Sequence, residues 1–185
     1  MKSVHQCSRR TFVAAGLAAG AVSALPSAVF AGLGVPGFHT QPWFAETTFD
    51  LRKDLAAAKE AGKTLVLLWE QEGCGYCRQM HAQAFQQPEL IDLGIQQFHV
   101  VQMDMHGKRK FADFSGAAVD ESKLARTLRV TGTPTTLFYD AAAKEVFRMP
   151  GYAQPEIFFL IYQYVAEKGY LTAKLEDWAA KKYGQ

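Results

Sequence analysis

The sequence contains little cysteine: Cys7, Cys74 and Cys77 are the three in 185 residues. It also lacks a long hydrophobic run, since the apolar stretch from Thr11 to Leu25 is too short and too rich in Ala and Gly to make a good membrane span. No internal repeat and no low-complexity block follows that stretch. The chain therefore does not read as a repeat protein or as a scaffold held together by many disulfides.

The first 31 residues contain no acidic side chain, whereas Lys2, Arg9 and Arg10 make their start basic. An apolar segment follows, and Val29-Phe30-Ala31 supplies acceptable residues at the positions that a signal peptidase reads. This order predicts an export signal that is removed near Ala31. A retained anchor or a buried helix is the alternative interpretation.

The basic pair lies in Ser8-Arg9-Arg10-Thr11-Phe12, which resembles the twin-arginine signal that carries folded cargo across the bacterial inner membrane. The likeness ends at Val13-Ala14, where that signal usually has Leu-Lys. Ordinary secretion therefore remains open. Either route predicts a periplasmic protein.

Removal of such a signal changes the charge balance. It takes away three of the 20 basic residues and none of the 18 acidic ones, which leaves a net charge of −1. Nothing in that balance favours a nucleic-acid partner. About 154 residues remain, enough for one domain. We expect a signal over residues 1–31, a flexible lead-in within 32–48, and a domain over 49–185.

Hydrophobic periodicity predicts a mixed α/β sheet with helices on both faces. The predicted strands are residues 64–70, 98–103, 135–140 and 145–149, and the last two form a hairpin. The predicted helices are residues 51–61, 75–87, 121–129, 155–168 and 174–183. Residues 104–120 are expected to form a long loop, in which the basic run Lys108-Arg109-Lys110 is solvated or docks an acidic partner.

Two cysteines separated by two residues stand between the predicted strand 64–70 and the following helix, in Cys74-Gly75-Tyr76-Cys77. The helix N-terminus carries partial positive charge and free N–H groups, which favour a thiolate at Cys74. Because a thiolate is the attacking species in disulfide exchange, this pattern predicts a thiol–disulfide oxidoreductase. A static disulfide or half of a metal site is the alternative.

The pair, together with Gly132-Thr133-Pro134-Thr135 before the third predicted strand, resembles the thioredoxin fold over residues 49–168. In that family the corresponding proline is cis and faces the cysteine pair, so the resemblance implies that role for Pro134. It also implies that the backbone of Thr133 can pair with a partner peptide as an added strand.

A wider set of residues resembles a subgroup, the periplasmic thioredoxins encoded with bacterial sulfur-oxidation systems (the SoxW and SoxS type). The set comprises Glu72–His81, Val101–Asp104, Leu124–Arg126, Thr133–Thr136 and Pro150–Tyr152. The likeness implies a periplasmic client with a disulfide or a modified cysteine, a membrane thiol–disulfide electron donor, no bound cofactor and a monomeric chain.

The chain departs from thioredoxins proper around the cysteines. Leu68 replaces a buried aspartate, Gly73 replaces a tryptophan, and Gly75-Tyr76 replaces Gly-Pro. The first departure leaves the second cysteine without its usual proton acceptor, and Glu70 and Glu72 are the candidate replacements, with water as the alternative. The last predicts a reduction potential above the roughly −270 mV of thioredoxin.

His81 falls on the same helical face as the cysteines. It is expected to be partly buried against the core, or else to modulate the thiolate or ligate a metal. Two cysteines and one histidine are too few for a closed structural zinc site, so we expect no metal.

The predicted function is thus reduction of partner disulfides, with Cys74 as nucleophile and Cys77 as the resolving thiol. Gly75 and Tyr76 support the site from between the cysteines. A disulfide oxidase or isomerase, or a non-catalytic module that binds a metal or a partner on the same fold, are the rival interpretations.

Overall fold

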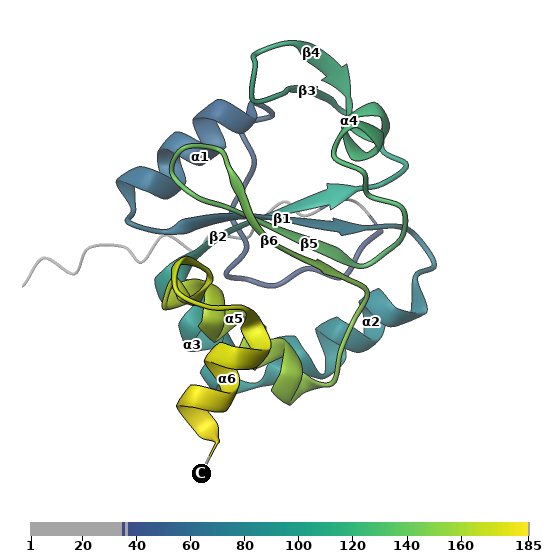
Figure 1. The fold of residues 1–185 in the computed structure, drawn as a ribbon. Coiled ribbons are helices and arrows are strands. Elements are labelled where there is room, and N and C mark those ends of the chain that lie inside the picture. Colours follow the sequence, from purple (N-terminus) through teal and green to yellow (C-terminus); the bar gives the residue numbers. More distant parts are fainter. Residues whose placement is uncertain (1–34, 36, 185) are drawn as a thin grey trace, which may run out of the picture.

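The centre of the fold is a four-stranded sheet in the order β2-β1-β5-β6 (Figure 1). The computed structural model describes residue 35 and residues 37–184, so the predicted export signal lies outside the described residues. β1 is parallel to β2 and antiparallel to β5, and β6 is antiparallel to β5. The strands are β1 (Thr64–Glu70), β2 (Phe98–Asp104), β5 (Thr135–Tyr139) and β6 (Glu145–Pro150).

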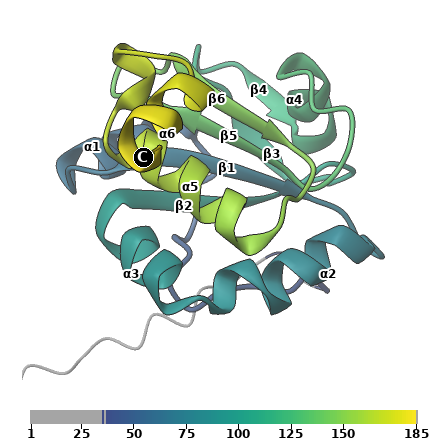
Figure 2. The same ribbon diagram turned by 60° about the horizontal axis from the view of Figure 1, so that its bottom comes forward.

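Helices cover both faces of this sheet, and Figure 2 shows the two helical layers from a second side. α1 and α4 lie over one face, and α2, α3 and α5 lie over the other. The prediction of a mixed α/β sheet flanked by helices is therefore confirmed. The helices are α1 (Leu51–Glu60), α2 (Gly75–Ala82), α3 (Pro88–Gln97), α4 (Glu121–Thr127), α5 (Pro155–Ala166) and α6 (Leu175–Tyr183). Among the described residues, none of the helices is long and apolar enough to span a membrane.

β1 is buried along nearly its whole length, and its side chains alternate between two hydrophobic clusters. Leu65, Leu67 and Trp69 pack on the side of α1 and α4, whereas Val66 and Leu68 pack on the side of α2, α3 and α5. Because strand side chains have a period of two, the same alternation assigns Glu70 to the face that α2 covers. The strand thus carries a carboxylate to the helix that begins at the cysteine pair.

The region after the cysteine pair differs from its prediction. In place of one helix over 75–87, α2 ends at Ala82 and a 3-10 turn, η1 (Ala84–Gln86), follows. Pro88 begins a new helix, α3, which the sequence analysis missed. Proline is favoured in the first turn of a helix because it has no N–H to leave unpaired, so Pro88 marks a start as well as a stop.

The stretch 104–120, predicted to be a loop, contains the short hairpin of β3 (Lys110–Ala112) and β4 (Ala118–Asp120). Within the basic run, Lys108 and Lys110 are exposed as expected, whereas Arg109 is half-buried. Arg109 pairs with the fully buried Glu121 and donates a hydrogen bond to the Gln102 carbonyl, while Lys110 pairs with Asp120 at the surface. The buried carboxylate anchors the hairpin to β2 through Arg109 and the Asp104 backbone N–H.

The segment before α1 also packs more closely than the expected flexible lead-in. Residues 37–44, here called the strap, lie against the domain, with Gln41 and Phe44 buried. The strap ends where the Ala45 N–H donates to the Val100 carbonyl at 2.8 Å, beside the free edge of β2. Trp43 packs with its ring on Gly94 of α3, so the strap is held at both the sheet and a helix.

Candidate functional site

Cys74 and Cys77 form a disulfide at the start of α2, with Cα atoms 5.2 Å apart. Cys74 is the N-cap residue, and its Sγ accepts a hydrogen bond from the Cys77 N–H at 3.0 Å. Cys77 is 5% exposed, whereas Cys74 is more accessible. The structure therefore places Cys74 where a partner sulfur can reach it and where a helix N-terminus stabilises a thiolate.

The neighbours of the pair explain two of the departures seen in the sequence. Gly73 has φ +73°, a left-handed conformation that residues other than glycine rarely adopt, so the tight entry from β1 into α2 favours a glycine here. Tyr76, between the cysteines, is 65% exposed. Its ring offers apolar surface beside the disulfide, next to Gly75, which is also exposed.

Thr133 and Pro134 lie at the end of the sheet where the cysteine pair also lies. The peptide bond between them is cis, and Pro134 is buried. The register of the sheet pairs Trp69 with Thr135, so Thr133 and Pro134 stand beyond the end of β1 from which the cysteine loop departs. The Pro134 carbonyl accepts from the Gly151 N–H at 2.7 Å, which fixes this turn to the end of β6.

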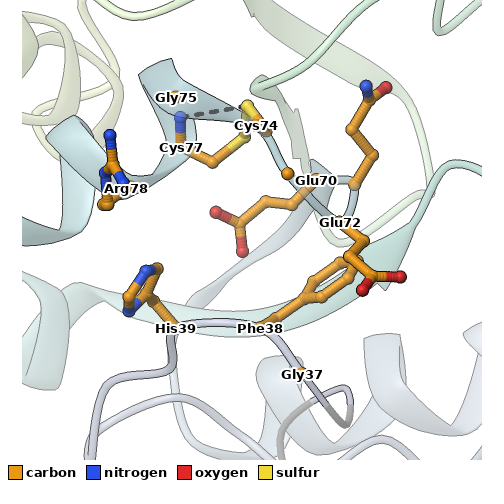
Figure 3. Close-up of a pocket in the computed structure, with 11 residues that line it drawn as sticks. Gly37, Phe38, His39, Glu70, Glu72, Cys74, Gly75, Cys77 and Arg78 are labelled. Atoms are coloured by element: carbon orange, nitrogen blue, oxygen red, sulfur yellow. Dashed lines mark hydrogen bonds between the residues drawn. A yellow bond between two sulfur atoms is a disulfide. The ribbon is translucent and has the colours of Figure 1, made fainter.

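A pocket of about 160 Å³ opens beside the disulfide (Figure 3). Three segments line it: the strap, the end of β1 with the loop that follows, and the first turn of α2. The strap contributes Gly37, Phe38 and His39. The other lining residues are Glu70, Gln71, Glu72, Gly73, Cys74, Gly75, Cys77 and Arg78. Figure 3 shows the Glu70 carboxylate reaching between the cysteine pair and His39.

Glu70 is 2% exposed, and its carboxylate is held from two sides. His81 Nε2 lies 2.9 Å from Oε1, and Gln102 Nε2 donates to Oε2. A buried carboxylate needs such partners, because an unpaired charge in the interior is strongly unfavourable. Of the two candidate proton acceptors, Glu70 is thus the one built into the interior beside the cysteines, while Glu72 is exposed.

His81 is fully enclosed, at 4% exposure, rather than partly buried. Its ring makes edge contacts with Phe44 and Phe85, with centroids 5.8 and 5.2 Å away. Its two nitrogens face Glu70 and Gln41. Within the part of the chain that the structure describes, no group of three or more His, Cys, Asp or Glu side chains could hold a metal. The structure therefore gives His81 a carboxylate partner, Glu70.

Sequence patterns alone do not predict three residues of the site: Gln41, Gln102 and His39. Gln41 lies 40 positions before His81, and Gln102 lies 32 positions after Glu70. Glutamine carries no chemistry that singles it out in a sequence. One signal was available for Gln102: it is a polar residue in a mostly apolar predicted strand, the next one along the chain after the strand of Glu70.

The comparisons agree with this geometry. The family of thioredoxin-like domains matches residues 51–166. A search of curated protein sequences finds no match to the chain. Among solved structures, a thioredoxin-fold protein from Helicobacter pylori is 19% identical, with a TM-score of 0.57, over 71% of this chain and 92% of its own.

A thioredoxin from Thermus thermophilus is 28% identical, with a TM-score of 0.52, over 63% of this chain and 84% of its own. The periplasmic thioredoxin SoxS from Paracoccus pantotrophus is 22% identical, with a TM-score of 0.40, over 58% of this chain and 99% of its own, which is too distant to identify a subgroup. A redox-type cysteine pair at a helix start, beside a cis-proline turn on a β2-β1-β5-β6 sheet, and the family match over residues 51–166 lead to one conclusion: the chain belongs to the thioredoxin-like family.

Proposed function

We propose that this protein reduces disulfides of partner proteins in the periplasm through the Cys74–Cys77 dithiol. The observation that carries the proposal is the cysteine pair itself: an accessible Cys74 capping α2, bonded to a buried Cys77 that lines the same pocket as Glu70. This arrangement gives the two thiols different tasks.

In the reduced protein the Cys74 thiolate attacks one sulfur of the partner disulfide. A bond forms between Cys74 Sγ and that sulfur, and the other partner sulfur leaves as a thiolate. Cys77 then loses its proton and attacks Cys74 Sγ, which breaks the mixed disulfide, releases the second partner thiolate and closes the Cys74–Cys77 bond. Two electrons have passed to the partner, whose thiolates take up two protons.

Glu70 is the proton acceptor for Cys77 in this proposal. Its carboxylate is buried, lines the pocket with both cysteines and is oriented by two hydrogen bonds. An acceptor placed in this way lets the buried thiol ionise only when attack is needed. The proton passes on to the departing partner thiolate or to water in the pocket.

Regeneration requires an external dithiol. A membrane thiol–disulfide carrier on the periplasmic side is the donor class that fits an exported chain. The resemblance to thioredoxins encoded with sulfur-oxidation systems favours a client from such a system, whose working cysteine becomes oxidised or modified.

Mixed-disulfide trapping tests the proposal. Cys77→Ser should hold a covalent complex with its client from a periplasmic extract, separable by dithiothreitol, and Cys74→Ser should hold none. Insulin reduction with dithiothreitol should be lost in both variants. If Cys77→Ser captures no protein while the folded wild type also fails to reduce insulin, the reductase assignment is wrong.

A further inference from the structure

The strap contributes more to the site than a wall of the pocket. Gln102 shows this first, because all of its polar atoms are used and its orientation is fixed. Its Oε1 accepts from the Val35 N–H at 3.2 Å, while its Nε2 donates to the His39 carbonyl at 2.5 Å and to Glu70 Oε2. A backbone N–H can only donate and a carbonyl can only accept, so the amide cannot be turned around.

Gln41 contacts His81 at the ring nitrogen that does not face Glu70. Its side-chain Nε2 lies 3.0 Å from His81 Nδ1, and both side chains are buried. An amide nitrogen only donates, so Nδ1 must accept, and the proton of the neutral ring must sit on Nε2. From Nε2 the ring then donates to Glu70 Oε1 at 2.9 Å.

We propose that Gln41 is a positioning residue for the thiol exchange: its amide holds His81 in the tautomer that donates to Glu70, and so keeps the Glu70 carboxylate ready to take the Cys77 proton. This inference rests on the proposed function. It assigns to the strap a part in the chemistry, although the strap contains none of the reacting atoms.

The alternative tautomer shows why the amide matters. With a proton on Nδ1, the bare Nε2 would face the Glu70 carboxylate, and two acceptors would repel each other at 2.9 Å. Without a donor at Nδ1, nothing on the strap side opposes that state. Glu70 would then lose one of its two hydrogen bonds in part of the molecules, and would bind a proton more readily.

Other titratable groups face this pair and have to be controlled. His39 of the strap lies with its ring centroid 5.9 Å from that of His81. Glu72 and Arg78 line the pocket from the loop and from α2, as do the two cysteines. Tyr162 of α5 stays neutral, because burial and, secondarily, the Glu70 charge raise its pKa. β2 contributes Gln102, which does not titrate.

The test follows the second of two thiol releases. Reduced protein is mixed with 5,5′-dithiobis(2-nitrobenzoate): Cys74 attack liberates the first coloured thiolate, and Cys77 attack on the mixed disulfide liberates the second. The rate of the second release is measured against pH in a His39→Gln background, which removes the titration of the exposed histidine. The nitrogen chemical shifts of His81 are recorded in parallel to identify the tautomer.

Three variants give distinct expectations. Gln41→Met keeps the length but has no donor, so the acid limb of the second release should move to higher pH, and the rate at neutral pH should fall about fivefold, the size of one lost hydrogen bond. Gln41→Glu supplies an acceptor that favours a doubly protonated ring beside Glu70, and the limb should move to lower pH. Gln86→Ala is the matched control, because Gln86 donates to the His81 backbone carbonyl and not to its ring.

The outcomes separate the two proposals. Opposite shifts for Gln41→Met and Gln41→Glu, with mixed and protonated His81 signals respectively, support the positioning role. Limbs that move together, or that stay with the Gln86→Ala control, overturn it while leaving the reductase assignment intact. If Gln41→Met does not fold, the isosteric Gln41→Glu alone decides by the direction of its shift. Absence of the second release in the wild type would overturn the proposed function itself.

Discussion

His81 Nε2 and Glu70 Oε1 lie 2.9 Å apart in the interior, so the end of β1 and the second turn of α2 are joined directly beneath the cysteine pair. The contact lies on the α2 face of the sheet, where the alternation of β1 puts the even-numbered side chains. It gives the site a carboxylate that is two positions later in the strand than the aspartate of thioredoxins proper, whose place Leu68 occupies.

Replacement of Glu70 tests whether this carboxylate takes over the role of the aspartate in thioredoxins proper. Glu70→Gln should slow the resolution of a mixed disulfide by about 100-fold at pH 7, because a positioned acid–base group contributes at least that much. Glu72→Gln should change the same rate by less than about threefold, since Glu72 is exposed. Stopped-flow measurement of the second thiol release decides between them, and the reverse ranking would assign the role to Glu72.

Tyr76→Pro should make the cysteine pair more reducing. Proline fits the first turn of α2 but removes the N–H of residue 76, one of the free donors at the helix start that stabilise a Cys74 thiolate. A hydrogen bond to a charged acceptor contributes about 1.5 kcal/mol, which corresponds to about 30 mV for this two-electron couple.

Titration against glutathione should show that fall from a wild-type value above about −270 mV. Tyr76→Ala retains the N–H and should shift the potential by less than half as much. A wild-type potential well below that of thioredoxin would contradict the expectation drawn from the Gly75-Tyr76 dipeptide.

The hairpin anchor predicts a large effect on stability. Arg109→Ala leaves the Glu121 carboxylate, which is 0% exposed, without its cation, and the free energy of unfolding should fall by about 3 kcal/mol. Lys110→Ala breaks the neighbouring surface pair with Asp120 and should cost no more than about 0.5 kcal/mol. Urea unfolding compares the two, and equal losses would show that the buried pair is not the anchor.

Gly94→Ala should destabilise the protein although alanine usually favours a helix. A Cβ at this position would lie 2.8 Å from Cζ3 of Trp43, closer than side chains tolerate, so the strap has to move. We expect faster proteolysis within the strap and a melting temperature lower by several degrees, about what 1 kcal/mol produces in a domain of this size. An unchanged melting temperature would mean that Trp43 does not fasten the strap to α3.

Acid should weaken the start of α1. The hydrogen bond and charge of Arg52 lower the pKa of Asp50 to about 2. A carboxyl whose pKa is lowered on folding contributes stability above its unfolded value, near 4, and loses that contribution as the pH falls towards 2. Asp50→Asn keeps a capping side chain, so it should be less stable than the wild type at pH 7, and most of that difference should be lost at pH 2. Thermal unfolding at both pH values measures the difference, and a gap as large at pH 2 as at pH 7 would contradict this origin.

Much of the fold could be predicted from local patterns. The strand 64–70 and the helix start at Gly75 follow from an apolar run and from the punctuation by Gly73 and Cys74, and the structure has both. α3 was missed because Pro88 was interpreted only as a stop. The pairing of Arg109 with Glu121 was missed because a run of basic letters does not show which of its members meets a buried acid.

In the candidate site, too, some residues could be predicted from the sequence and others could not. Cys74, Cys77 and Glu70 could be found because their side chains have distinctive chemistry and lie close together in the sequence. Gln41 could not, since only the docking of the strap brings its amide to His81. Gln102 reaches Glu70 through the pairing of β2 with β1, and its role depends on which of its amide atoms meets the carboxylate. Hydrogen-bond direction, which needs coordinates, is what gives these amides a role.

The place of Gln41 in the chain has a practical consequence for protein production. A fragment cut at the limits of the family match, residues 51–166, would retain both cysteines, Glu70 and His81, and would look complete by every active-site motif. It would begin ten residues after Gln41. Assays on such a fragment would therefore report on the cysteine pair without the amide that, through His81, orients Glu70. Expression boundaries for this protein should be set upstream of the strap rather than at the first helix.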